Sequence, residues 1–529
     1  MNFKHYNQQQ TILLPYSFDD LIPKKHPVRV VDQVVESINI QPLLKAYSKE
    51  GNPGYHPKML LKVMLYAYMT NVYSSRKIEL ALRENINFMW LTSMTVVDHN
   101  TINRFRSNKL KDSFKEIFKQ VVLMLASEGL ITLKQIYTDG TKIEAQAGRY
   151  TFVWGKSIKT NKAKMLTQLE DLWNYAQSID NDDNPDPEPT EFKEISKEVI
   201  EKTVAKIDAK LSGNEKASSK SKAKLRYIKN NFVANLEKYE QQEAILAERN
   251  SYSKTDTGAT FMRMKEDHMR NGQLKPAYNT QISTENQIII HYTIHQNPTD
   301  TKTLKPHLEN FEKTFGKEAL QQLKEITADA GYGSEENYDY LQEKELTAYV
   351  KYNTFDKEQD KNYQKKNKPF SKENLYYNPE EDYYVCPMGQ KMHKTHQSKR
   401  TTEAGYEQSL SHYQAKNCEG CPLRGQCFKA KGNRSIERNH NLERHKQRTR
   451  ELLLSETGIQ KRKQRTADVE PVFAQLKHNN GFRRFSLKGL EKVALEFGVM
   501  ALGHNLRKKL PLKDNFNFFQ QNKKSNQTD

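Results

Sequence analysis

Apolar residues at helical spacing dominate the first quarter of the chain. Between Tyr55 and Phe105, leucine, methionine and tyrosine side chains recur every three or four residues, as at Leu60, Leu61 and Met64. Asp98 stands just before another such run and has the side chain of a helix N-cap. The pattern therefore predicts a compact helical domain over residues 1–125.

The pattern changes to strands after this region. The stretch "LKQIYTDGTKIEA" predicts a strand that ends at Asp139, and "PAYNTQISTENQIIIHYTIHQ" predicts a hairpin that turns at Glu285 and Asn286. The Lys- and Glu-rich text between them predicts a helical insertion over residues 158–250, with "SIDNDDNPDPEPTEF" as an exposed loop inside it.

Helices and strands alternate beyond the hairpin. "TKTLKPHLENFEKTF" and "SEENYDYLQEK" are typical of helices, whereas "LKEITADAGYG" and "LTAYVKY" are typical of strands, the first of them ending at Asp329. This order predicts an α/β fold with helices packed on a mixed sheet. We expect this core to comprise residues 126–354 and 441–510, with a cysteine-rich insertion at 355–440 and a disordered tail at 511–529.

The charge of the chain and the absence of long apolar runs narrow the class of protein. The 529 residues carry a formal net charge of +19, which favours a polyanion as partner, nucleic acid before a membrane surface. The start of the chain lacks the pattern of a secretory signal, and no run of about 18 apolar residues is present, so we expect a cytoplasmic protein without a membrane partner.

Two of the predicted strands end at acids in similar surroundings. Asp139 lies in "IYTDGT" and Asp329 in "ITADAGYG", and ligands of α/β sheets bind beyond the ends of the strands. Two carboxylates on neighbouring strands repel each other unless a cation lies between them, and oxygen ligands favour Mg²⁺ or Mn²⁺. Gly140, which follows the first acid, is interpreted as clearance for the ions and for DNA.

A third acid comes from the helix predicted in "RTADVEPVFAQLK". Glu470 lies at the edge of its apolar stripe, with Lys477 on the same side two turns later and Arg465 before it. A third carboxylate permits two metal ions, while the two basic side chains are suited to holding phosphate.

The four cysteines are confined to one short region. Cys418 and Cys421 form a CxxC pair that Cys427 follows, and Cys386 lies upstream. Four thiolates could close a tetrahedral Zn²⁺ site, although the spacing departs from that of a standard zinc ribbon. Reduced structural cysteines and redox chemistry are the alternatives.

The segments "DGTKIEA", "PAYNTQ", "ADAGYGSEENYDYL" and "VEPVFAQLKHNNGFRRFSLKGLEKVALEFGVMALGHNLRKKL" together resemble the DDE transposases of bacterial insertion sequences. The matching branch has an N-terminal helical domain and a cysteine-bearing insert, and the resemblance covers about residues 15–510. It implies a ribonuclease-H-like, retroviral-integrase-type core and the acidic triad Asp139, Asp329 and Glu470. The related proteins often have a tyrosine about two turns before the glutamate, where this chain has the basic residues 461–463.

The resemblance implies a transposase that binds the ends of an insertion sequence and catalyses cleavage and transfer of DNA strands with two Mg²⁺ or Mn²⁺ ions. Its partners would be double-stranded DNA, as terminal inverted repeats and target, and a second copy of the chain in a homodimer. A catalytically silent DNA-binding derivative and a plain metal-dependent nuclease are the alternatives.

Four further side chains are candidate DNA contacts. Trp154 either stacks on a flipped base or packs internally, and Lys142 either touches phosphate or lies on the surface. Arg76 and Arg106 of the helical domain either face phosphate or belong to a solvated helix face.

Overall fold

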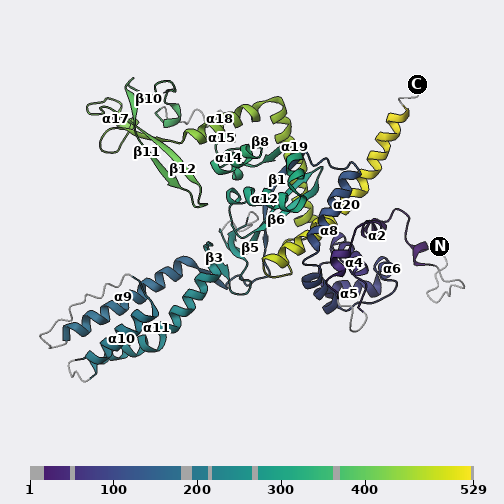
Figure 1. Ribbon diagram of the computed structural model, residues 1–529, viewed down its shortest axis with the longest axis horizontal. Helices are drawn as coiled ribbons and strands as arrows, with labels where there is room; N and C mark the ends of the chain where they lie inside the picture. Colours follow the sequence, from purple (N-terminus) through teal and green to yellow (C-terminus); the bar gives the residue numbers. More distant parts are fainter. Residues whose placement is uncertain are drawn as a thin grey trace, which may run out of the picture.

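The computed structural model describes residues 17–47, 54–179, 194–212, 217–264, 272–360 and 370–525, with side chains to residue 510. The loop predicted in "SIDNDDNPDPEPTEF" lies almost entirely outside these ranges. Figure 1 shows a central α/β body from which a helical arm and a smaller sheet extend.

The N-terminal region is helical, and Asp98 caps its seventh helix by accepting hydrogen bonds from the backbone of Asn100 and Thr101. The region contains α1 (Phe18–Leu21), α2 (Pro27–Ser37), α3 (Gln41–Leu44), α4 (Pro57–Met69), α5 (Ser75–Glu84), α6 (Ile86–Leu91), α7 (His99–Arg104), a π-helical turn (Phe105–Lys109) and α8 (Phe114–Ser127). Its apolar side chains join those of the central sheet in one continuous hydrophobic core. The helical region therefore does not have a core of its own.

The central sheet is mixed. Its strands are β1 (Gln135–Glu144), β4 (Thr260–Arg263), β5 (Leu274–Glu285), β6 (Ile288–His295), β7 (Glu325–Ala328) and β8 (Thr347–Val350), in the order β4-β5-β1-β7-β8 with β6 also paired to β5. β1, β7 and β8 are parallel, whereas β5 runs antiparallel to its neighbours. The predicted hairpin is confirmed: β5 turns into β6 through Asn286 and Gln287, which both have positive φ angles.

Helices cover both faces of the sheet. On one face, Asp468 of α19 (Glu456–Ala474) accepts a hydrogen bond of 2.6 Å from Thr284, which lies opposite Tyr137 of β1. On the other face, His307 of α12 (Leu304–Phe315) bonds Ser283, whose hydroxyl meets that of Thr138. Because neighbouring residues of a strand point to opposite faces, α19 and α12 lie on opposite sides of the sheet.

Further helices pack around the central sheet, and one of them, α20, connects it to the N-terminal helices. They are α13 (Lys317–Gln322), α14 (Glu335–Glu343), α15 (Phe355–Gln359), α18 (His440–Leu454) and α20 (Leu490–Ser525), with the 3-10 turns η2 (Asp300–Lys302) and η3 (Ala330–Tyr332). α20 packs against β6 and against the N-terminal helices α4 and α8. Its backbone is helical through Ser525, where the sequence predicts a disordered tail from residue 511.

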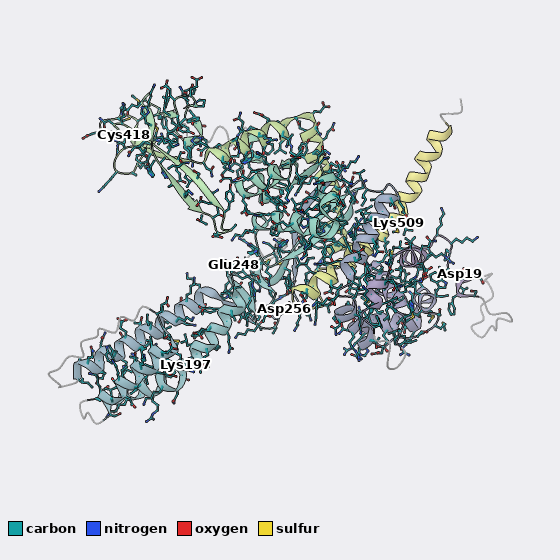
Figure 2. The ribbon with its side chains drawn as sticks, in the orientation of Figure 1. Asp19, Lys197, Glu248, Asp256, Cys418 and Lys509 are labelled. Atoms are coloured by element: carbon teal, nitrogen blue, oxygen red, sulfur yellow. The ribbon has the colours of Figure 1, made fainter. Side chains whose placement is uncertain are left out.

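A three-helix arm interrupts the body between β2 (Phe152–Trp154) and β3 (Ser251–Ser253). It contains α9 (Gly155–Ile179), α10 (Lys197–Leu211) and α11 (Ser219–Leu246), which pack around a separate apolar cluster. In Figure 2, Lys197 labels the arm, and Glu248 and Asp256 label its base.

A second sheet lies in the part of the chain that contains the cysteines. Its five antiparallel strands are β9 (Tyr377–Asn378), β10 (Tyr383–Val385), β11 (Lys391–Thr401), β12 (Glu407–Ala415) and β13 (Ser435–Arg438), accompanied by the short helix α17 (Arg424–Cys427) and the 3-10 turn η4 (Lys372–Asn374). Cys418 labels this sheet in Figure 2, where the sheet and the arm both extend to the left of the body, the sheet above the arm. No helix within the described ranges is both long enough and apolar enough to cross a membrane.

Candidate active site

Asp139 lies where β1 loses its parallel neighbour. The pairing of β1 with β7 ends at Thr138 and Ala328, so Asp139 is the first residue of β1 beyond it. The strand itself does not end there, because β5 continues to pair with β1 as far as Glu144. The prediction that the strand ends at Asp139 is therefore wrong, but the residue does stand at the carboxyl edge of the parallel part of the sheet, where ligands bind.

Asp329 follows the last residue of β7 directly. It is the N-cap of η3, and its carboxylate accepts a hydrogen bond of 2.7 Å from the amide of Ala330. The carboxylate of Asp139 accepts a similar bond of 2.8 Å from Gly140. Both acids are thus oriented by the backbone that follows them.

The third acid, Glu470, meets the other two at a single guanidinium group. Arg465, on the same helix α19, has Nη2 at 3.2 Å from Asp139 Oδ2 and at 3.5 Å from Asp329 Oδ2. Its Nη1 lies 3.7 Å from Glu470 Oε1. The structure therefore brings all three predicted acids together around one positive charge.

Exposure differs among these four side chains. The side chains of Arg465 and Asp139 retain 13% and 12% of their accessible surface, whereas those of Asp329 and Glu470 retain 49% and 55%. The inner part of the cluster is therefore shielded, while its outer part is open to a large partner.

The donor chemistry of the cluster fits a divalent cation. All the acceptors are carboxylate oxygens, which hard cations such as Mg²⁺ prefer, and Arg465 supplies positive charge at their centre. The Nε atom of Arg465 is buried and has no hydrogen-bond partner among the described residues. Within those residues no three His, Cys, Asp or Glu side chains are grouped closely enough to hold a metal, so these acids are gathered by the guanidinium.

A buried polar layer lies behind Asp139, on the α12 side of the sheet. Tyr332 donates its hydroxyl to Gln281, and the amide of Gln281 donates to Asp300 at 3.0 Å. Burial, and after it the charge of Asp139, raises the pKa of Tyr332 well above its usual value. Sequence reasoning missed this layer, although Asn279 and Gln281, polar residues on one face of a buried strand, were a signal for it.

Gly140 has a different role from the predicted one. A Cβ atom there would lie 2.2 Å from Gln281 Nε2 and 2.8 Å from Asp300 Oδ1, on the face away from Arg465. The absence of a side chain makes room for the buried layer, so the interpretation as clearance for metal ions is not supported.

The candidate DNA contacts differ in how far their side chains are exposed. Arg76 is exposed on α5, and Trp154 is partly buried beside Phe261, with 5.9 Å between ring centroids. Lys142 donates to the carbonyl of Arg263, and Lys477 is 7% exposed in a π-helical turn (Gln475–Asn479).

Arg106 contradicts the prediction of a DNA contact. It is 4% exposed and donates hydrogen bonds of 2.9 Å to the hydroxyl of Tyr68 and to the carbonyl of Tyr73. Its guanidinium therefore stabilises the packing of the N-terminal helices.

The cysteines lie in segments next to the second sheet, after β10, after β12 and in α17, and they are not disulfide-bonded. Cys386 and Cys418 pack against the same apolar cluster, and each sulfur accepts a backbone N–H bond of 3.3 Å. Arg434 joins two of them, because its amide bonds Cys418 and its guanidinium lies 2.7 Å from the sulfur of Cys427. The described side chains do not form the predicted zinc site.

Two family models match the chain. One, described as a transposase DDE domain, matches residues 385–510, and the other, described as "Transposase domain (DUF772)", matches residues 16–108. No curated protein and no solved structure matches. The two matches support a DDE transposase family, and a DDE domain implies a ribonuclease-H-like fold, which the mixed sheet fits. Glu470 and Arg465 lie within the matched residues, whereas Asp139 and Asp329 do not.

Proposed function

We propose that this protein is a DDE transposase that binds the ends of an insertion sequence and catalyses metal-dependent DNA cleavage and strand transfer. One observation carries the proposal: three acids that lie far apart in the sequence converge on Arg465 at the carboxyl edge of the parallel strands. Transposases act on DNA, and DDE domains generally use divalent metal ions.

The three acids have distinct roles in this proposal. Asp139 is the shielded ligand, fixed by the amide of Gly140, whereas Asp329 and Glu470 lie at the open side where a phosphodiester would approach. A pair of Mg²⁺ or Mn²⁺ ions held by these acids would supply the activation of water or of a 3′-hydroxyl and the stabilisation of the leaving oxygen. Arg465 then moves from the carboxylates to the scissile phosphate.

Other parts of the chain would hold DNA. The net charge of +19 provides the electrostatic attraction, and the exposed Arg76 and the aromatic surface at Trp154 are candidate contacts. A homodimer would hold the two ends of the insertion sequence together.

The alternatives have less support. A catalytically silent derivative would not need three acids at one cation, and a plain nuclease would not need the helical arm and the second sheet. Both family matches carry transposase descriptions.

The proposal is tested with a donor plasmid. In this plasmid a marker replaces the coding region and keeps the DNA that flanks the coding region on each side. Asp139→Asn, Asp329→Asn and Glu470→Gln should each abolish excision and strand transfer, because each removes a charged ligand while preserving shape. DNA binding, measured by gel shift, should be retained.

Asp356→Asn is the matched control, because this exposed acid pairs with Lys351 and is not one of the carboxylates that meet at Arg465. Wild-type levels of strand transfer in all three triad variants would contradict the proposal.

A further inference from the structure

A fourth carboxylate, Asp300, lies against the candidate site from the opposite face of the sheet. It begins η2, the turn between β6 and α12, and it is half-buried. An ideal Cβ on Gly140 would meet Asp300 Oδ1 at 2.8 Å, and one on Gly331 would meet Oδ2 at 3.4 Å. Each oxygen of Asp300 therefore faces the backbone beside one acid-bearing segment.

Hydrogen bonds give this contact a fixed polarity. Asp300 Oδ1 accepts from Asn279 Nδ2 at 2.9 Å and from Gln281 Nε2 at 3.0 Å. The amide nitrogen of Gln281 thus points to Asp300, and its oxygen accepts the hydroxyl of Tyr332. A carboxylate can only accept here, so it determines which way both amides are turned.

The same turn is also connected to η3. Thr301 donates to the carbonyl of Gly331 at 2.9 Å, and Tyr332 is the last residue of η3, three residues after Asp329. β1, β5 and η3 therefore all meet at Asp300 or its neighbour. Asp139 belongs to the first of these segments, and Asp329 immediately precedes the last.

We propose that Asp300 is a positioning residue, whose negative charge fixes the Asn279 and Gln281 amides and thereby the separation of the Asp139 and Asp329 carboxylates. This inference rests on the proposed function of the triad. It assigns Asp300 no contact with DNA or metal, because it lies on the far face of the sheet from Arg465. Its effect is transmitted through hydrogen-bonded partners of the ligands, as is usual behind metal sites.

The decisive variants move the charge rather than the shape. Asp300→Asn keeps the size and one acceptor oxygen but removes the charge. Gln281→Glu places a second carboxylate within hydrogen-bonding distance of Asp300, so these two groups repel each other. In the double variant Asp300→Asn/Gln281→Glu a single carboxylate is restored, now on the other side of the bond, with Tyr332 still able to donate to it.

The measurements are the rate of strand cleavage and the affinity for Mn²⁺ determined by titration without DNA. We expect each single variant to lower both by about 10- to 100-fold. The double variant should recover much of that loss, which a purely additive effect of two damaging changes would not produce. Asp356→Asn, the control for loss of a carboxylate outside the cluster, should match the wild type.

Asp139→Asn is measured alongside to separate the two claims. Cleavage by Asp139→Asn at the wild-type rate would overturn the proposed function. If only Asp139→Asn is inactive and Asp300→Asn cleaves DNA and binds Mn²⁺ like the wild type, the inference about Asp300 is overturned. A double variant no better than either single variant contradicts the inference in both measurements.

Discussion

At the scale of single residues, the site depends on Arg465. Its guanidinium group lies within 4 Å of three carboxylates, and without a cation those acids would repel one another. Arg465 therefore has two functions in this account: it keeps the acids together in the free protein and becomes available to phosphate when DNA and metal are bound.

Replacing Arg465 with glutamine should make the stability of the protein depend on divalent cations. Without metal the free energy of unfolding should fall by about 1–3 kcal/mol, because one charge-assisted hydrogen bond, to Asp139, and two longer ion pairs are lost. Mg²⁺ should raise the melting temperature of this variant more than that of the wild type, since binding to the folded state stabilises it.

Differential scanning fluorimetry with and without Mg²⁺ checks this expectation. Arg448→Gln, which changes an exposed arginine on α18, is the control. Equal responses of the two variants to Mg²⁺ would show that Arg465 does not hold the acids together.

The sequence predicted the acids better than their surroundings. Asp139, Asp329 and Glu470 could be found because each stands at a recognisable place on its own strand or helix. The reason for Gly140 could not be found, because Asp300, which fills the adjacent space, lies 160 residues away in the chain. Burial of Arg106 was equally hidden, since its partners Tyr68 and Tyr73 belong to preceding elements.

At the scale of secondary structure, α19 places Arg465 and Glu470 over the sheet. The helix begins immediately after α18, and Gly458 in its first turn allows the two helices to approach closely. A Cβ on Gly458 would lie 2.1 Å from the carbonyl oxygen of Leu452 and 2.8 Å from the Cα of Leu453. These are backbone atoms, which cannot move aside without shifting a helix.

Gly458→Ala should therefore destabilise the protein by about 1–3 kcal/mol and lower its cleavage activity by displacing α19. Urea unfolding measures the first effect and the DNA cleavage rate the second. Gly425→Ala is the matched control, because no atom lies within 4 Å of the corresponding Cβ. Equal stability of the two variants would mean that the contact between α18 and α19 does not set the position of α19.

Elements with a buried apolar face could be predicted from the sequence more readily than exposed ones. The β5–β6 hairpin was visible because apolar residues and turn residues specify it locally. The second sheet could not be predicted in this way, because apolar and polar residues hardly alternate along β11. This strand is exposed along most of its length and rich in lysine and histidine. Its strands are specified by pairing with β10 and β12, which a local pattern does not reveal.

At the scale of the whole molecule, the arm is an appendage to the body. β2 and β3 pair directly at its base, with Trp154 opposite Ser251, and the amide of Gly155 bonds the carbonyl of Asn250 at 3.0 Å. The two ends of the arm are therefore adjacent, and its apolar cluster is separate from the main core. The domain boundaries predicted from sequence stay predictions, whereas the shared core of the N-terminal helices and the sheet was not anticipated.

Replacing residues 156–249 by a short Gly/Ser linker should leave the body folded but weaken DNA binding. The first turns of α11 carry five basic residues and no acidic ones, namely Lys220, Lys222, Lys224, Arg226 and Lys229. Loss of phosphate contacts should lower both the affinity for DNA and the steepness of its dependence on salt. Fluorescence anisotropy over a range of salt concentrations measures both.

A charge-only variant serves as the control for the loss of the arm. Lys220→Gln/Lys224→Gln should reproduce part of the change in salt dependence with the arm intact. An unchanged affinity and an unchanged salt slope in the shortened protein would exclude the arm from DNA binding.

The central claim is that Asp139, Asp329 and Glu470 form one metal-dependent cleavage site. Single-turnover cleavage of a duplex carrying the element end, measured as a function of Mg²⁺ concentration, tests it most directly. We predict no cleavage without Mg²⁺, cleavage by the wild type and by Asp356→Asn once it is added, and none by Asp139→Asn, Asp329→Asn or Glu470→Gln despite normal DNA binding. Metal-independent cleavage, or cleavage by the triad variants at the wild-type rate, would contradict the account.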